Sequence, residues 1–229
     1  MLSIILSLIW EPLSSLRAAL SCIFGKKPSF NFYNLNPTKL RSRQLTRTPI
    51  LLLHGNYHNQ SAWLSLAKKL KKFHFAGALF TVTLPNGPVT QKDYEIIYKK
   101  ILEIKHLYNF YGVAIKELHL IGHSRGAFIA DSLLHSDFLQ DLLPDALKET
   151  LQEITLGKVV KLGYARQKID VDPKNNEFEI TGVNDKIFPE KSLLPPTQCR
   201  DISCGHLGLI YAKRCHQLII VWLRPHLDA

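Results

Sequence analysis

Short apolar runs alternate with longer amphipathic stretches along most of this sequence. The runs have the composition of buried strands, and the stretches repeat apolar residues every three or four positions, as helices do. Such alternation is typical of a parallel sheet with helices on both faces, so we predict an α/β fold with a mostly parallel sheet of about six or more strands. The predicted strands lie within residues 50–56, 77–84, 116–121, 157–165, 176–189 and 199–206, and those in 50–56 and 176–189 end in a loop. The predicted helices cover residues 61–73, 91–110, 125–136, 141–152 and 207–223. Ser61 is expected to cap the first of these helices.

One short motif, LIGHSRGAFIA, places a serine between two glycines. A random chain of this length contains G-x-S-x-G about once in twelve cases at average composition, so the motif alone is weak. Its context is more specific, because Ser124 falls where a predicted strand turns into a predicted helix. Gly122 and Gly126 leave room for a tight turn there. We predict that Ser124 is a nucleophile; a tight turn that happens to contain a serine is the alternative.

A serine hydroxyl needs a base, and the base needs an orienting acid. The chain has ten histidines, and His206 stands out because it follows the last predicted strand in the loop CGHLG. Asp185 follows the preceding strand in GVNDKIFP. Each of the three side chains comes after a separate strand, so the sheet would bring them to one edge. His58 also lies in a loop and stays open as another base.

Acyl transfer also needs donors for the oxyanion of its tetrahedral intermediate. The sequence HGN ends the first strong strand with a glycine that allows the backbone to turn. We predict that the backbone N–H groups of Asn56 and Arg125 form the oxyanion hole; a common turn at HG is the alternative. The candidates for the substrate pocket are His54, Gly55, Tyr57 and His123.

Taken together, these motifs resemble the α/β-hydrolase superfamily over about residues 50–223. The matching pieces are LLLHGN, LIGHSRG, GVNDKIFP and CGHLG, in the order in which the family has them. The resemblance implies that Ser124 is the nucleophile, that His206 is the general base and then the general acid, and that Asp185 orients it.

Three features depart from the family pattern. Only 61 positions separate Ser124 from Asp185, which leaves residues 141–152 as the sole candidate for a lid and predicts an open, shallow site. Arg125 replaces the more usual apolar or amide residue, and we expect it to pair with a nearby acid rather than to select anionic substrates. The family's early antiparallel strands are not evident, although residues 40–46 could supply one.

The first 49 residues carry an uneven share of positive charge. Seven lysines and arginines face a single glutamate there, so the segment contributes +6 of the net charge of +10. The spacing of apolar residues in 1–24 predicts a helix with one apolar stripe, and charged residues and a proline interrupt the segment too often for it to span a bilayer. We predict an amphipathic and basic extension over residues 1–44 and a catalytic domain over residues 45–229. We expect the extension to pack on the domain or to contact a membrane peripherally; a solvated arm and a signal peptide are the alternatives.

Four cysteines, at positions 22, 199, 204 and 215, show no C-x-x-C pair. The spacing of a zinc site is absent, and buried free thiols are expected rather than a disulfide. We predict no metal and no cofactor. A cytoplasmic location is expected, with membrane association through the N-terminus and secretion as the alternative. Nucleic-acid binding is disfavoured because no RNA-binding or helix-turn-helix signature is present.

The sequence therefore predicts a serine hydrolase that cleaves carboxylic esters, including lipid-derived esters, through a Ser-His-Asp triad and an acyl-enzyme. A thioesterase, an amidase or a peptidase with the same triad is the first alternative. A membrane-associated, non-catalytic module of hydrolase shape is the second. Acyl length and leaving group are not encoded in any motif that we identify.

Overall fold

Six of the predicted apolar runs form one sheet in the computed structural model, which describes residues 45–72, 77–135, 144–164, 173–189 and 191–224. The strands are β1 (Ile50–Leu53), β2 (Leu79–Val82), β3 (Glu117–His123), β4 (Thr155–Leu162), β5 (Glu177–Gly182) and β6 (Cys199–Ile202). Their order is β2-β1-β3-β4-β5-β6, and every neighbouring pair is parallel. The predicted parallel sheet is confirmed.

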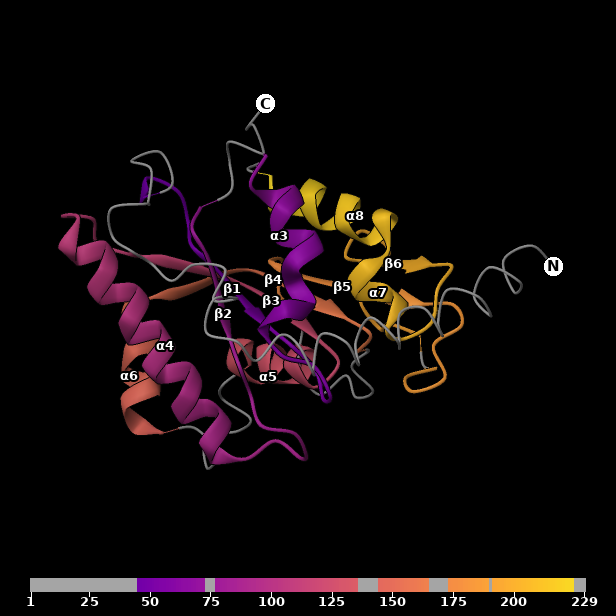
Figure 1. Ribbon diagram of the computed structural model, residues 1–229, viewed down its shortest axis with the longest axis horizontal. Helices are drawn as coiled ribbons and strands as arrows, with labels where there is room; N and C mark the ends of the chain where they lie inside the picture. The colour runs from indigo at the N-terminus through magenta and orange to yellow at the C-terminus, as the bar shows by residue number, and fades with distance from the viewer. Residues whose placement is uncertain (1–44, 73–76, 136–143, 165–172, 190, 225–229) are drawn as a thin grey trace.

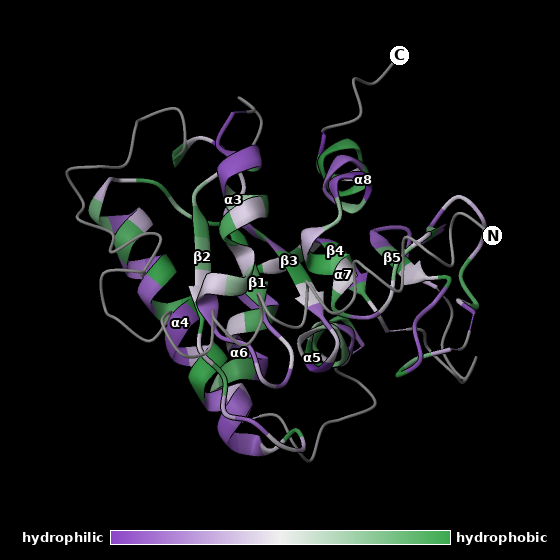
Figure 2. Ribbon diagram, turned by 45° about the vertical axis from the view of Figure 1, so that its right-hand side comes forward, coloured by the Kyte–Doolittle hydropathy of each residue, from purple (hydrophilic) through white to green (hydrophobic). Residues whose placement is uncertain are grey.

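Helices cover both faces of this sheet (Figure 1). One face packs against α3 (Leu64–Leu70), α7 (Gly208–Tyr211) and α8 (Lys213–Leu223). The other packs against α4 (Gln91–Phe110), α5 (Arg125–Leu134) and α6 (Asp145–Glu153). Each face has its own apolar core, and hydrophobic residues concentrate in the strands and along stripes of the helices (Figure 2).

Helix α4 spans the residues that the sequence predicts, because local signals define both its start and its buried face. A capping box at Thr90 and Asp93 satisfies the first backbone N–H groups. Its buried apolar residues recur at helical spacing and form one stripe against the sheet. They are Tyr94, Ile97, Ile101, Ile104 and Tyr108.

Two predicted helices differ in detail. The first begins as a 3-10 turn, η3 (Gln60–Trp63), and its cap is Asn59, whose side chain accepts the N–H of Ser61; the prediction of Ser61 as the cap was wrong. The last helix divides into α7 and α8, because Ala212 adopts an extended conformation. The carbonyl of Ile210, near the end of α7, accepts a hydrogen bond from His216 Nε2 at 2.6 Å.

The structure describes most of the segment predicted as a lid, but most of the segment predicted as an early strand lies outside the described residues. The segment considered as a lid forms α6, which packs against α4 and β4 with Leu147 fully buried, as part of a layer. Residues 40–44 lie outside the described residues, and Leu45 and Thr46 are not in a strand. Residues 1–44, with the predicted extension and Cys22, also lie outside them.

Strand order creates the position for a site. The chain passes from β1 outward to β2 at the edge and then returns to β3 on the other side of β1. The connections leave in opposite directions there, so a crevice opens beyond the carboxyl ends of β1 and β3. His54 to Asn56 follow β1, and Ser124 follows β3. The fold therefore brings the HGN and G-x-S-x-G motifs to the place where such sheets bind ligands.

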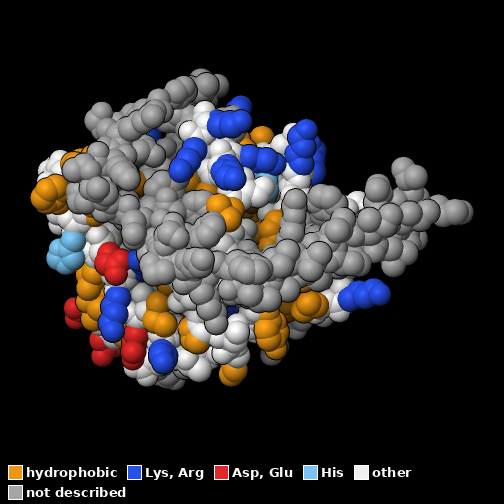
Figure 3. All heavy atoms as spheres, in the orientation of Figure 1, with side chains coloured by type: hydrophobic (Ala, Val, Ile, Leu, Met, Phe, Trp, Pro, Cys, Tyr) orange, Lys and Arg blue, Asp and Glu red, His pale blue; other side chains and the backbone are white. Residues whose placement is uncertain are grey.

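A basic surface that the sequence analysis did not single out lies over α3 and α8. Neither helix contains an acidic residue, and lysine and arginine side chains gather there (Figure 3). The exposed basic residues of α3, its C-terminal end and α8 are Lys68, Lys71, Lys72, Lys213 and Arg214. Among the described residues, no helix combines the length and apolar content needed to cross a bilayer. The described cysteines are free thiols; Cys204 and Cys215 are buried as predicted, whereas Cys199 is half-buried.

Candidate active site

Ser124 occupies a strained turn between β3 and α5. Its φ of 52° and ψ of −121° lie in a part of the backbone map that residues other than glycine rarely adopt. The turn is so tight that a Cβ on Gly126 would lie 2.2 Å from the carbonyl oxygen of Leu53. Strain of this kind persists where the surrounding structure holds it, and it concentrates at functional sites. The predicted strand–turn–helix context of Ser124 is confirmed.

His206 and Asp185 form a buried hydrogen-bonded pair. His206 Nδ1 lies 2.7 Å from Asp185 Oδ2, and the two side chains are 5% and 1% exposed. The other carboxylate oxygen, Oδ1, accepts the backbone N–H groups of Ile187 at 2.8 Å and Phe188 at 2.9 Å. The acid loop therefore fixes the carboxylate, and the carboxylate requires the proton of His206 to be on Nδ1. Nε2 is left as the basic nitrogen.

The turn of Ser124 and the ring of His206 meet at the end of β4. The N–H of Ser124 donates to the carbonyl of Leu162 at 2.8 Å. The next residue, Gly163, faces the histidine ring so closely that a Cβ there would lie 2.9 Å from His206 Nδ1. The described residues contain no hydrogen bond between Ser124 Oγ and His206 Nε2. In unliganded enzymes such bonds are often long and tighten only when substrate binds.

His123 connects the strand of the serine to the loop of His206. Its Nε2–H donates to the backbone carbonyl of His206 at 3.0 Å, and the two ring centroids are 4.7 Å apart. Burial, reinforced by His206 and His58, lowers the pKa of His123 well below its usual value. His123 is therefore neutral and positions the His206 backbone. Its predicted contact with substrate stays a prediction.

The HGN loop lies against the serine turn. A Cβ on Gly55 would lie 2.9 Å from Ser124 Cβ. The turn after β2 braces the loop, since Asn56 Oδ1 accepts the N–H of Gly87 at 3.0 Å and the N–H of Tyr57 donates to Asn86 Oδ1 at 2.8 Å. Tyr57 itself has a φ of 60° and is 76% exposed.

The two predicted oxyanion donors lie on either side of this contact. Asn56 belongs to the HGN loop, and Arg125 begins α5 directly after Ser124. In the described part of the chain, neither backbone N–H group donates to a protein acceptor. Two N–H groups that flank a serine can stabilise an oxyanion that forms there.

His54 has both of its ring nitrogens engaged. Nδ1–H donates to the carbonyl of Gly55 at 2.8 Å, and Nε2 accepts the N–H of Leu84 at 2.9 Å. Burial lowers the pKa of His54 to about 4, which agrees with the neutral ring that these two bonds require. His54 therefore ties the end of β1 to the end of β2. Only its ring carbons remain for its predicted role in the pocket.

Arg125 pairs with a buried acid, as expected from the sequence. Its Nη2 lies 2.5 Å from Asp93 Oδ2 and 3.1 Å from the carbonyl of Pro88, and both charged side chains are buried. Asp93 also caps the start of α4. The arginine therefore anchors the serine turn to α4 and is not directed at a substrate anion.

His58, the other candidate base, does not pair with Asp185. Its ring packs edge-on against His123, with centroids 5.7 Å apart, whereas Asp185 binds His206. Burial lowers the pKa of His58 to about 4.

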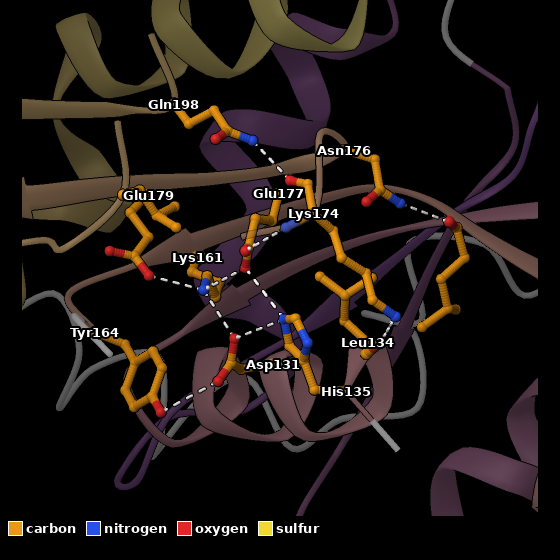
Figure 4. Close-up of polar contacts among 12 residues, drawn as sticks. Asp131, Leu134, His135, Lys161, Tyr164, Lys174, Asn176, Glu177, Glu179 and Gln198 are labelled. Carbon is orange, nitrogen blue, oxygen red and sulfur yellow. Dashed lines mark hydrogen bonds and ion pairs between the residues drawn. The ribbon is translucent and has the colours of Figure 1, made fainter. Parts of the chain in front are cut away.

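A cluster of buried charges lies behind the site, between α5, β4 and β5 (Figure 4). Asp131, His135 and Glu177 offer ligand atoms within 4.8 Å of one another, the one such group among the described residues. The ammonium group of Lys161 already lies 2.8 Å from Asp131 Oδ1 and 2.9 Å from Glu177 Oε2. The positive charge of this cluster thus comes from Lys161. Asp131, His135 and Glu177 therefore do not fit a metal ion in addition to the lysine.

Buried histidines make stability depend on pH. Burial lowers the pKa of His54, His58, His119 and His216 to about 4, and that of His123 well below 6.5. In the unfolded chain they titrate near 6.5, so unfolding between pH 6.5 and 4 takes up protons. We expect the free energy of unfolding to decrease as pH falls through this window, by about 1.4 kcal/mol per pH unit for each such histidine. Urea denaturation at several pH values measures the slope. A flat profile between pH 6.5 and 5 would show that the native histidines are already protonated.

Neither a protein-family model nor a curated protein matches this sequence. Solved structures do match. An extracellular alpha/beta-hydrolase from a Paenibacillus species aligns with a TM-score of 0.51 and 11% identity, over 78% of this chain and 100% of its own. A membrane phospholipase A aligns with a TM-score of 0.50 and 11% identity, over 78% of this chain and 79% of its own. The chain has the α/β-hydrolase fold. The fold prediction is therefore confirmed, whereas the chemistry depends on the geometry described above, because identity this low establishes the fold alone.

The α/β-hydrolase fold accounts for the places of the site residues. Ser124, Asp185 and His206 each follow the carboxyl end of a different strand, β3, β5 and β6. No sequence motif identified the aromatic side chains beside them, Phe128, Tyr164 and Phe188. Contacts between three separate segments bring these rings together, and no local motif carries that information.

Proposed function

We propose that the protein is a serine hydrolase that cleaves carboxylic esters through an acyl-enzyme. The best support is the 2.7 Å bond between His206 Nδ1 and Asp185 Oδ2, at the sheet edge where Ser124 has a strained backbone. A buried Asp–His pair that leaves Nε2 unprotonated is the arrangement that a serine nucleophile needs. The HGN loop beside Ser124 adds a place for the negative charge.

In the proposed mechanism, Ser124 Oγ attacks the ester carbonyl while His206 Nε2 takes its proton. Asp185 stabilises the imidazolium that forms, and the N–H groups of Asn56 and Arg125 bind the oxyanion. The tetrahedral intermediate collapses, and His206 gives the proton to the departing alcohol. A water molecule then attacks the acyl-enzyme while His206 takes its proton as general base. Collapse of this second tetrahedral intermediate releases the carboxylic acid and free Ser124.

Covalent labelling of the serine tests this proposal. A fluorophosphonate probe is expected to label the wild-type protein, with the adduct mapped to Ser124 by mass spectrometry. Ser124→Ala is expected to abolish the labelling. Ser65→Ala, which removes a half-buried hydroxyl on α3, is the matched control and should be labelled like the wild type. Absence of labelling in the folded wild type, or equal labelling of Ser124→Ala, would contradict the proposal.

The leaving group needs a separate comparison. Thioesterases, amidases and peptidases use the same triad, so matched p-nitrophenyl ester, thioester and anilide substrates with one acyl group separate these alternatives. We expect the ester to have the highest kcat/KM.

The proposal also includes peripheral membrane contact through residues 1–44. Flotation with anionic liposomes, comparing the full chain with a variant that lacks these residues, tests that part, and equal flotation of both would refute it.

A further inference from the structure

Three aromatic rings form a row beside the proposed catalytic histidine. Phe188 packs on His206, with ring centroids 5.5 Å apart and planes inclined by 34°. Tyr164 meets Phe188 at 6.2 Å, and Phe128 meets Tyr164 at 5.9 Å, both nearly edge-on. These are the spacings at which aromatic pairs attract one another. We call Phe128, Tyr164 and Phe188 the aromatic row.

The aromatic row connects the nucleophile to the base. Phe128 lies one helical turn after Ser124, and its N–H donates to the serine carbonyl at 3.0 Å. At the other end, the N–H of Phe188 donates to Asp185, the partner of His206. The row therefore begins and ends at residues held directly by the proposed triad. The rings therefore extend from the helix that follows Ser124 to the loop that holds Asp185.

The row keeps apolar surface accessible next to the site. Phe128 is 37% exposed, and Tyr164 and Phe188 are half-buried. Ile187, beside Phe188 on the acid loop, is 61% exposed. An exposed apolar group next to a catalytic site is a common feature of ligand binding, because burying it against a ligand is favourable.

The buried charge cluster holds the centre of the row in place. The hydroxyl of Tyr164 donates to Asp131 Oδ2 at 3.4 Å, and Lys161 Nζ lies 5.8 Å from the centroid of its ring (Figure 4). Asp131 is in turn bound by Lys161 at 2.8 Å. The position of Tyr164 therefore does not depend on a substrate, and a rigid surface loses little entropy when it binds one.

We infer that the aromatic row is the acyl-binding surface and that the substrates are esters with an extended apolar acyl chain rather than acetate esters. This inference rests on the proposed function, since it assigns the acyl group to a reaction at Ser124. A chain that lies along the row buries its methylene groups against ring faces and edges. Each buried methylene contributes up to about fourfold in affinity.

A chain-length series tests the inference. We expect kcat/KM for p-nitrophenyl octanoate to exceed that for the acetate by about tenfold or more. Phe128→Ala is expected to reduce the octanoate value about five times more than the acetate value, and Phe128→Leu, which keeps apolar surface, to recover most of the difference. The matched control is Phe110→Ala, an aromatic that is 73% exposed at the last residue of α4, which should match the wild type with both substrates.

The outcomes separate this inference from the proposed function. If the fluorophosphonate labels Ser124 but kcat/KM is flat across chain length, the catalytic proposal stands and the acyl surface is wrong. Equal losses for acetate and octanoate in Phe128→Ala would also overturn it, because such losses indicate a disturbed Ser124 turn. Failure of labelling in the wild type would refute the function itself. The labelling rate of Phe128→Ala reports whether Ser124 is still intact in that variant.

Discussion

Asp185→Asn is expected to lower kcat for ester hydrolysis by about four orders of magnitude, the loss typical when the acid of a Ser-His-Asp triad becomes an amide. Asp185 Oδ1 accepts two backbone N–H groups, so the amide oxygen of asparagine would take that place. Its NH2 group would then face His206 Nδ1, which would have to accept. The ring proton would move to Nε2, where it prevents proton transfer from Ser124. Steady-state kinetics on p-nitrophenyl butyrate, with circular dichroism to verify folding, measure the effect.

Asp201→Asn is the matched control for this prediction. Asp201 is an exposed acid on β6, and its carboxylate accepts a hydrogen bond from the hydroxyl of Thr181. The same change of carboxylate to amide there should alter kcat by less than about threefold, because no group of the site depends on it. If Asp185→Asn stays within tenfold of the wild type, or if the two variants lose equal activity, Asp185 is not the orienting acid.

Local signals explain why much of the fold and of the site could be predicted. Helix α4 carries its own capping box and apolar stripe, and its predicted bounds are those of the structure. Ser124 lies between a strand-like and a helix-like segment, which is sufficient to predict its strained turn. The pairing of Asp185 with His206 follows from topology, because the carboxyl ends of parallel strands meet at one edge of the sheet.

Contacts between distant segments explain what the sequence could not predict. Arg125 was expected to find an acid, but its partner Asp93 lies 32 positions away. The two backbone bonds of His54 and the bond from His123 to His206 depend on how loops from different strands pack. Loop conformations of this kind carry no periodic signal.

The buried charge cluster around Lys161 was not predicted, although the sequence carried a signal for it. The strand segment NEFEITG has acids at alternate positions, and GKVVKLG has two lysines, Lys158 and Lys161, within a predicted buried strand. Alternate residues of a strand point to the same face, so Glu177 and Glu179 had to share one face of a covered sheet. Buried carboxylates require a cation, and the two lysines of the neighbouring strand were the candidates; the structure places Lys161 among the carboxylates. The cluster in Figure 4 could therefore have been predicted.

Lys161→Met is expected to destabilise the protein by about 3–5 kcal/mol at pH 7, the cost of removing one partner from a buried ion pair. Lys161 is fully buried, and its Nζ lies 2.7–2.9 Å from Glu179, Asp131 and Glu177. Burial alone would lower its pKa, but the three carboxylates outweigh that effect and raise the pKa above its ordinary value. Methionine fills a similar volume without charge, so the carboxylates would lose their cation. Urea denaturation gives the free energy of unfolding.

Lys158→Met tests whether the loss is specific to the cluster. Lys158 is a half-buried lysine on the same strand, and its ammonium group binds the carbonyls of Trp222 and Arg224. Because these partners are neutral, its replacement should cost about 1 kcal/mol. Equal stability of the two variants at pH 7 would show that Lys161 does not neutralise the carboxylates.

The cost of Lys161→Met should itself depend on pH and on Glu179. Without the ammonium group, the buried carboxylates carry negative charge that no cation balances, and protonation removes that charge, so acid relieves the variant. We therefore expect the stability difference between wild type and variant to narrow as pH falls from 7 towards 5.

Adding Glu179→Gln removes one of the three charges and should recover about 1–2 kcal/mol of the loss at pH 7. Strictly additive effects of the two substitutions would mean that Lys161 and Glu179 are not coupled, and the cluster would then stabilise the fold through packing rather than through charge.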